Sequence, residues 1–346
     1  MNIISNVESK DNTSMWEANN IMNILVTGAL GNVGIYTINE LLKHKDNHII
    51  GIDNCITRSI NRLSHINDQD SRFTFINSNK IYQEDFNIED IFKEHNFDDI
   101  LHLAGRVGTA NSFKEPKSYI ENNVLFITEL LDLSVRYNIN RFVFASSSVV
   151  YGTNYTVPSF ETHFPKPNSV YGVSKYAAEL LAKVYYDTFK LNTIGLRYYN
   201  IIPPIEFIDE SDIIYMFAKK ILNNETIRLY NNGKQLRQYV PIDNIVLANI
   251  LALTTNNKEC FGEVFNISVD CNPISLESLV LYIARYYDVD SPKIEYIDDK
   301  AIGDVDVCFG SIEKAKKLLG YKPKVDMYEY INNILKYVRN SNNAIR

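Results

Sequence analysis

The sequence predicts an α/β protein: a doubly wound parallel sheet followed by a smaller mixed α/β lobe. Between residues 23 and 200, short apolar runs alternate with segments whose apolar residues recur at helical spacing. This alternation is typical of parallel β-α-β units. After Asn200 the chain passes through Pro203-Pro204 and the regular alternation ends, which indicates the second lobe.

The elements follow from apolar spacing. In the first part we expect strands at 24–27, 49–52, 73–76, 100–103, 142–145 and 193–196, and helices at 33–42, 88–95, 118–137 and 170–189. In the second part we expect helices at 213–222, 243–253 and 276–286, strands at 227–230, 264–267 and 293–296, and two carboxy-terminal helices.

Composition narrows the function classes. The 346 residues are 45% hydrophobic, so the chain can bury a sizeable core. A net charge of -7 and the lack of a dense Lys/Arg stripe argue against nucleic acid as a partner. Four scattered cysteines show no metal-ligand spacing, so we expect no metal site. The sequence shows neither a signal peptide nor an apolar run of membrane-spanning length, so we expect a cytoplasmic protein without membrane contact.

A glycine-rich run, Gly28-Ala-Leu-Gly31-Asn-Val-Gly34, follows the first strand and opens the first helix. Glycines at such a turn allow a tight bend and the close approach of a pyrophosphate, as in Rossmann-type dinucleotide sites. Asp53 ends the next strand about twenty residues later, where its carboxylate can accept the ribose hydroxyls and repel a 2′-phosphate. The order of these features predicts an NAD site.

Tyr171 and Lys175 lie four residues apart on an expected helix, so they share one face. An ammonium near a phenol favours the phenolate, which can take a proton from a substrate hydroxyl. Loss of hydride from the carbon below would then reduce a nicotinamide. The pair therefore predicts an oxidation coupled to the cofactor.

Several further motifs carry a family resemblance. They are Leu101-His-Leu-Ala-Gly105, Ser146-Ser-Ser-Val-Val-Tyr-Gly152, Tyr171-Gly-Val-Ser-Lys175 and Leu196-Arg-Tyr-Tyr-Asn200. With them the chain resembles the extended short-chain dehydrogenases/reductases, specifically the NAD-dependent epimerase/dehydratase family and its UDP-glucose 4-epimerase-like nucleotide-sugar enzymes.

The resemblance implies roles for individual residues. It implies that Ser147, Tyr171 and Lys175 are catalytic. It implies that NAD is bound by Gly28, Leu30, Gly31, Asn32, Val33, Asp53, Asn54, Leu103, Ala104, Gly105, Asn123, Ser146, Tyr171, Lys175 and Tyr198. It implies that a nucleotide sugar is bound by Arg106, Ser147, Ser148, Asn200 and Arg237.

The same resemblance narrows the reaction. The family's dehydratases and decarboxylases carry acidic residues after the catalytic hydroxyl, whereas this chain has Ser148 and Val149. A 3,5-epimerase would need a cysteine, and none lies near Ser147 in the sequence. We therefore expect a 4-epimerase that oxidises a sugar hydroxyl and returns the hydride to the other face. An NAD-dependent 4-dehydrogenase/reductase and, more remotely, a non-catalytic NAD-binding regulator remain alternatives.

One departure concerns the diphosphate. Where the family usually has an arginine two residues before a Gly-Asp pair, this chain has Ala301. Arg237 remains a reasonable diphosphate ligand, although a lone arginine in this lobe could equally form a surface ion pair.

The resemblance also predicts the organisation of the chain. We expect a flexible leader (1–22), an NAD-binding domain that carries the catalytic residues (23–200), a mainly substrate-binding lobe that can return elements to the first domain (201–340), and a tail (341–346). Relatives commonly pair through the helices at 118–137 and 170–189, which implies a homodimer or a tetramer built from it.

Overall fold

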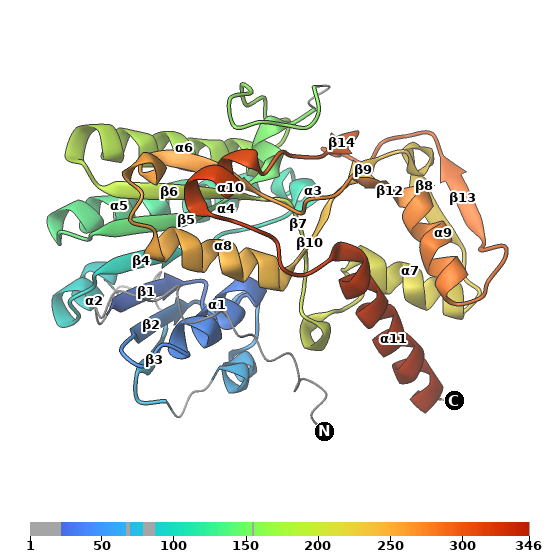
Figure 1. The fold of residues 1–346 in the computed structure, drawn as a ribbon, viewed down its shortest axis with the longest axis horizontal. Helices are drawn as coiled ribbons and strands as arrows, with labels where there is room; N and C mark the ends of the chain where they lie inside the picture. Colours follow the sequence, from blue (N-terminus) through green and yellow to red (C-terminus); the bar gives the residue numbers. More distant parts are fainter. Residues whose placement is uncertain (1–21, 67–69, 79–86, 154–155, 346) are drawn as a thin grey trace.

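A parallel sheet of seven strands forms the centre of the computed structural model, which describes residues 22–66, 70–78, 87–153 and 156–345 (Figure 1). Every neighbouring pair in this sheet is parallel, and the sheet confirms the predicted Rossmann-type architecture. Its strand order is β11 (Glu263–Ile267), β6 (Asn192–Tyr198), β5 (Arg141–Ser147), β4 (Asp99–His102), β1 (Asn23–Thr27), β2 (His48–Asp53) and β3 (Phe73–Asn77).

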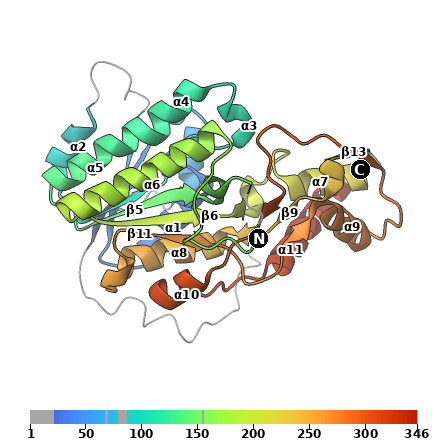
Figure 2. The same cartoon turned by 90° about the horizontal axis from the view of Figure 1, so that it is seen from above.

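Helices cover both faces of the sheet because successive strand side chains point to opposite sides. Leu25 and Phe142 pack toward α2 (Ile88–Glu94), α5 (Phe126–Arg136) and α6 (Val170–Phe189). Ile24 and Val143 belong to the other core cluster, with α1 (Asn32–Leu42) and α8 (Ile242–Thr254). Figure 2 shows α5 and α6 running side by side over the sheet.

The helix expected at 118–137 differs from the prediction. It consists of α4 (Pro116–Ile120), a π-helical turn η3 (Glu121–Leu125) and α5. Apolar spacing does not distinguish a π turn from an α turn, so the sequence pattern predicted one continuous helix. Such turns are frequent at functional sites, and this one contains Asn123.

The second lobe lies beyond the carboxyl ends of the main strands (Figure 1). It contains the helices α7 (Ile213–Leu222), α9 (Leu276–Tyr286) and α11 (Met327–Ile345), and the parallel pair β8 (Ile227–Tyr230) and β13 (Ile294–Ile297). Two short sheets join it to the main domain: β7 (Asn200–Ile202) with β10 (Tyr239–Pro241), and β12 (Ile274–Ser275), β9 (Leu236–Arg237) and β14 (Val307–Cys308).

The chain returns to the main domain after the second lobe has begun, as the expected organisation allows. Strand β11 joins the main sheet, and helix α8 belongs to a core cluster of that sheet. Helix α11 continues to Ile345, which places most of the expected tail in a helix. The expected leader lies outside the described residues apart from Met22. Within the described part of the chain, no helix is long and apolar enough to span a membrane.

Candidate active site

The glycine-rich turn brings the first strand, the first helix and the fourth strand into close contact. Gly28 has a φ of 72°, and a Cβ there would lie 2.7 Å from the backbone nitrogen of Ala104. A Cβ on Gly34 would lie 2.3 Å from the carbonyl oxygen of Gly28. Gly31 caps α1 without any side-chain hydrogen bond, so the N–H groups at this helix end remain available to an anion.

Asp53 stands at the carboxyl end of β2, next to this turn. One carboxylate oxygen accepts a hydrogen bond from the backbone nitrogen of Leu30 at 3.0 Å, and the other accepts one from Cys55 at 2.9 Å. These bonds hold the carboxylate at the wall of a cleft of about 690 Å³. Most of the predicted cofactor residues line this cleft: Gly28, Gly31, Asn32, Val33, Asp53, Asn54, Leu103, Ala104 and Gly105.

The far end of the cleft is built from the end of β4 and the π turn. The side-chain oxygen of Asn123 accepts a hydrogen bond from the backbone nitrogen of Arg106 at 2.7 Å, and its amide nitrogen donates to the Arg106 carbonyl at 2.9 Å. The same nitrogen donates to the hydroxyl of Ser174 on α6 at 2.9 Å. A Cβ on Gly105 would lie 2.9 Å from Asn123 and 3.4 Å from the Lys175 ammonium, so these groups enclose the glycine. Asn123 thus ties the cleft to the catalytic helix.

The three predicted catalytic residues come together where β5 meets α6. Ser147 ends β5, while Tyr171 and Lys175 lie in the first two turns of α6, which Ser169 caps by accepting a hydrogen bond from Gly172. All three side chains are buried. Burial raises the pKa of Tyr171 to about 12, and a hydrogen bond with Ser147 partly offsets that rise.

Lys175 differs from the expectation in its effect on Tyr171. Its ammonium donates to the Ala145 carbonyl at 2.8 Å, and the lowering of the tyrosine pKa comes from Ser147 rather than from this lysine. Burial lowers the pKa of Lys175 to about 8, although the carboxylate of Glu179 one turn later raises it. In this arrangement the lysine therefore faces Gly105 and the strand end rather than the phenol.

Two predicted cofactor residues lie behind the site. Ser146 donates to the Glu179 carboxylate at 2.5 Å, and Arg197 binds that carboxylate through two nitrogens, at 2.8 and 2.6 Å. Tyr198 points to the opposite face, where its hydroxyl donates to Asn249 of α8 at 2.5 Å. The alternation of strand β6 turns Tyr198 away from the cleft, so the expected contact of this residue with the cofactor is not supported by its placement.

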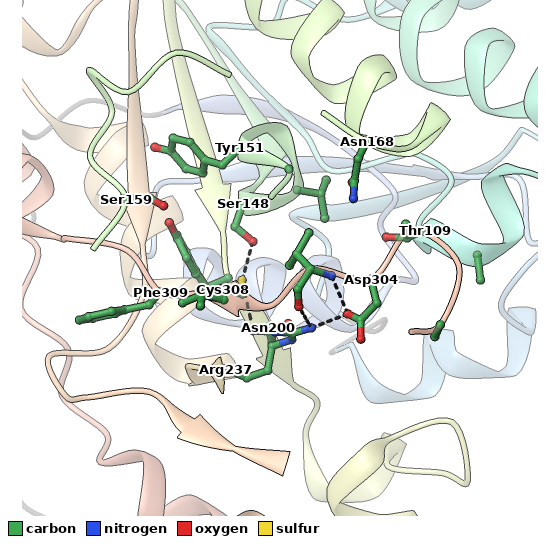
Figure 3. Close-up of a pocket in the computed structure, with 18 of the residues that line it drawn as sticks. Thr109, Ser148, Tyr151, Ser159, Asn168, Asn200, Arg237, Asp304, Cys308 and Phe309 are labelled. Carbon is green, nitrogen blue, oxygen red and sulfur yellow. Dashed lines mark hydrogen bonds and ion pairs between the residues drawn. The ribbon is translucent and has the colours of Figure 1, made fainter. Parts of the chain in front are cut away.

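A second pocket, of about 280 Å³, lies beside the catalytic strand end (Figure 3). Three of the residues expected to bind the nucleotide sugar line this pocket: Ser148, Asn200 and Arg237. Ser147 precedes Ser148 in the chain but does not line the pocket. The guanidinium of Arg237 pairs with the carboxylate of Asp304 and donates to the Val305 carbonyl at 2.8 Å. The one cation among its described lining residues is therefore already paired with an acid.

Sequence reasoning missed Cys308 in this pocket. It lies far from Ser147 in the sequence, yet its thiol is 3.3 Å from the Ser148 hydroxyl and 3.6 Å from the Asn200 amide (Figure 3). No cysteine lies near Ser147 in the sequence, but the fold brings Cys308 to Ser148, the next residue. Burial raises the pKa of this thiol, so the thiolate that would act as a base is disfavoured.

Arg106 lines the cofactor cleft instead of the second pocket. Its guanidinium pairs with Glu115 and donates to the Ser118 hydroxyl at 3.1 Å. The remaining predicted site residues are thus divided between two adjoining spaces. In the described residues, no group of three His, Cys, Asp or Glu side chains is arranged to hold a metal ion.

The site fits a dinucleotide. The uncapped start of α1 can receive the pyrophosphate, the Asp53 carboxylate can receive the ribose hydroxyls, and the glycines let the turn pack closely against the backbone that follows β4. His102 is a neutral group behind the cleft, since burial lowers its pKa to about 3, and its ring shares a hydrogen bond of 2.7 Å with the hydroxyl of Thr27, which lines the cleft.

Comparisons with known proteins agree with this geometry. The family model described as GDP-mannose 4,6 dehydratase matches residues 25–334. UDP-glucuronate 4-epimerase 4 of Arabidopsis thaliana is 30% identical over 342 residues, which cover 93% of this chain and 75% of the relative.

Two solved structures superpose over 92% of this chain and 99% of their own. The UDP-glucuronic acid 4-epimerase of Bacillus cereus, in complex with UDP-glucuronic acid and NAD, has a TM-score of 0.81 at 27% identity. The UDP-glucose 4-epimerase of Thermotoga maritima, with UDP-glucose, has a TM-score of 0.80 at 28% identity. Together with the site geometry, these matches show that the chain is an NAD-dependent enzyme of the NAD-dependent epimerase/dehydratase family.

Proposed function

We propose that the chain is a nucleotide-sugar 4-epimerase that keeps NAD in the cleft between turnovers. One observation carries the proposal: Ser147, Tyr171 and Lys175 come together between two spaces. Lys175 approaches Gly105, which lines the NAD-type cleft, and Ser148, which follows Ser147, lines the second pocket together with Arg237. Bound NAD would accept a hydride from the sugar and return it.

The protein's part of the reaction is proton transfer and orientation. The hydroxyl of Ser147 can hold the sugar oxygen beside Tyr171, and the phenolate form of Tyr171 can take that oxygen's proton. Because burial raises the pKa of Tyr171 to about 12 in the ligand-free site, we expect positive charge brought by the bound cofactor to favour the phenolate. Returning the hydride to the other face then requires the keto sugar to turn within the pocket.

The absence of a suitable acid supports epimerisation over dehydration. Elimination of water needs an acid and a base besides the tyrosine, but Ser148 and Val149 occupy the positions after Ser147. Among the described residues that line the second pocket, the one carboxylate is Asp304, and Arg237 holds it as an ion pair. The proposal therefore departs from the dehydratase that names the family model.

The charged side chains in and near the second pocket favour a neutral sugar as the substrate. Arg237 must serve the diphosphate, and it is the one cation among the described lining residues of the second pocket. Arg106 is paired with Glu115, and Lys300 is paired with Asp306. A uronic acid would add a carboxylate without an unpaired counter-ion, which is unfavourable in a partly desolvated site. We infer that a neutral hexose is preferred over a uronic acid.

The test uses UDP-glucose and UDP-glucuronate as probes, without added NAD. We expect purified or NAD-loaded enzyme to form UDP-galactose from UDP-glucose, and to be at least about tenfold less efficient with UDP-glucuronate. Net accumulation of NADH with a released keto sugar would favour the dehydrogenase. Efficient conversion of UDP-glucuronate would contradict the preference for a neutral sugar while leaving the epimerase assignment intact.

A homodimer is proposed from one helical face. Val173, Leu180 and Val184 recur on α6 and are 47 to 55% exposed, and Leu125 of the π turn is 60% exposed. The helices α5 and α6 run side by side in one layer over the sheet (Figure 2). A second copy placed on this layer would bury these side chains in a four-helix contact. Sedimentation should show a dimer or a tetramer, and Leu180→Glu should give a monomer.

A further inference from the structure

A short segment after β7 contacts the adenosine side of the main domain. We call this segment, η5 (Ile205–Phe207), the strap. The ring of Phe207 lies 3.7 Å from the guanidinium of Arg62 and 4.6 Å from the ring of His65, both in the helical turn η2 (Ile60–His65). Glu206 of the strap also accepts a hydrogen bond from the hydroxyl of Tyr36 on α1.

Arg62 connects the strap to the glycine-rich turn. One guanidinium nitrogen donates to the Leu30 carbonyl at 2.8 Å, and another donates to the Asn32 side chain at 2.5 Å. Both acceptors lie between Gly28 and Gly34, in the turn that receives the pyrophosphate. On the side facing the strap, Arg62 contacts the Phe207 ring and interacts electrostatically with Glu206 and Asp209.

The chain on either side of the strap forms a wall of the cofactor cleft. Ile201 and Pro203 line the cleft before the strap, and Ser211 and Asp212 line it afterwards. Burial lowers the pKa of Arg62 to about 10 and the charge of Arg58 lowers it as well, whereas Asp53, Asp209 and Glu206 favour the charged form. Detaching the strap would therefore both expose the cleft wall and remove a contact that orients the glycine-rich turn.

We propose that Phe207 and Arg62 are positioning residues that retain the dinucleotide by fastening the strap over the glycine-rich turn. Phe207 acts through Arg62, and Arg62 acts through the Leu30 carbonyl and Asn32. The device links the substrate lobe to the cofactor turn, so it keeps the cofactor in place while the sugar is exchanged. The inference takes from the proposed function only that NAD is the ligand of the cleft, and its test requires no sugar.

The experiment measures the rate at which NAD leaves the holoenzyme. The protein is loaded with radiolabelled NAD, mixed with excess unlabelled NAD, and sampled by rapid gel filtration. Phe207→Ala and Arg62→Lys are compared with wild type, because lysine keeps the charge but cannot bridge the two acceptors. Phe261→Ala is the matched control, since its half-buried ring lies 5.6 Å from the guanidinium of Arg141, away from the cleft.

We expect Phe207→Ala to release NAD about tenfold faster than wild type, and Arg62→Lys to do so by a smaller factor. Phe261→Ala should release NAD at the wild-type rate even if its melting temperature falls. Unchanged release from both variants would overturn the proposal. The melting temperatures of the nucleotide-free proteins are measured alongside. If NAD release is faster in every variant whose melting temperature falls, including Phe261→Ala, the proposal is also overturned. Failure of epimerisation with any sugar would leave these rates, and so this inference, unaffected.

Discussion

The cofactor cleft and the second pocket are built in different ways. The cleft lies at the ends of neighbouring strands, at Gly28, Asp53 and Leu103, where backbone N–H groups donate hydrogen bonds to the side chains of Asp53 and Thr27. The second pocket gathers residues from distant segments, including Asn168, Arg237 and Asp304, and its charges are already paired with each other. The difference indicates that the cleft is formed for one fixed ligand, whereas the selectivity of the pocket depends on few residues.

The largest expected effect is at the junction of the two regions. Tyr171→Phe removes the hydroxyl that transfers the proton, so turnover should fall about 10³-fold or more. NAD content should stay close to wild type, because the ring remains packed 6.0 Å from that of Tyr119. Turnover is measured as epimer formation, and retained NAD by its absorbance after heat release. Wild-type turnover in this variant would show that another group is the base.

The cleft itself can be broken by one methyl group. Gly34→Ala would place a Cβ 2.3 Å from the Gly28 carbonyl oxygen, so the turn must move. We expect NAD affinity to fall about 10- to 100-fold, measured by calorimetry on nucleotide-free protein. Gly320→Ala is a useful contrast: it has no atom within 4 Å of its added Cβ, although its φ of 69° disfavours alanine. Its NAD affinity should not change.

The pH dependence of turnover tests the role of Lys175, which lies where the cleft and the second pocket meet. The ammonium of Lys175 is lost as pH rises through about 8, because burial lowers its pKa. Between pH 7 and pH 9 the protonated fraction falls about tenfold. We expect the rate of NAD reduction by bound sugar to follow it, because Lys175 is one of the residues expected to hold NAD. Lys175→Arg stays charged over this range, so its residual rate should lack this alkaline decrease. A decrease that persists unchanged in Lys175→Arg would assign it to another group.

The charge of the second pocket can be altered by breaking the ion pair between Arg237 and Asp304. Asp304→Asn keeps the shape of the side chain but frees the charge of Arg237, which the Leu236 and Val305 carbonyls still hold in place. We expect efficiency with UDP-glucuronate relative to UDP-glucose to rise about fivefold. Asp306→Asn is the matched control, since Asp306 pairs with Lys300 and does not line the pocket. Equal shifts in the two variants would contradict a specific role for Arg237.

The smallest expected effect comes from adding a cation. Ala301 lines the second pocket, and Ala301→Arg would place a guanidinium where the family usually has one. UDP should then bind about threefold more tightly, measured by titration with UDP alone. Ala301→Gln controls for added length without charge. Equal affinities for the arginine and glutamine variants would show that position 301 does not reach the diphosphate.

The same contrast explains what could be predicted from the sequence. Gly28, Asp53, Ser147 and Tyr171 follow or precede apolar runs, and parallel strands bring such positions to one edge of the sheet. Cys308 and Asp304 reach the pocket through β14 and the loop before it, and this contact depends on tertiary packing rather than on spacing.

At three other positions the spacing of residues in the sequence did not predict the structure, for physical reasons. Tyr198 follows the apolar pattern of β6, but which face it occupies depends on strand register, and its hydroxyl bonds Asn249. The π turn that contains Asn123 keeps nearly the same apolar spacing as an α-helix, so the sequence pattern does not reveal it. The ammonium of Lys175 donates to the backbone carbonyl of Ala145. A sequence pattern describes side chains and therefore could not predict this contact.

The most direct test of the central claim follows the hydrogen at the reacting carbon. UDP-glucose deuterated at C4 is incubated with the holoenzyme, without added NAD, and the product is examined by mass spectrometry and NMR. The account predicts UDP-galactose that retains the deuterium at C4, because the hydride leaves to the resident cofactor and returns to the same carbon. A released 4-keto sugar with deuterium recovered in free NADH, or an epimer with solvent hydrogen at C4, would contradict it.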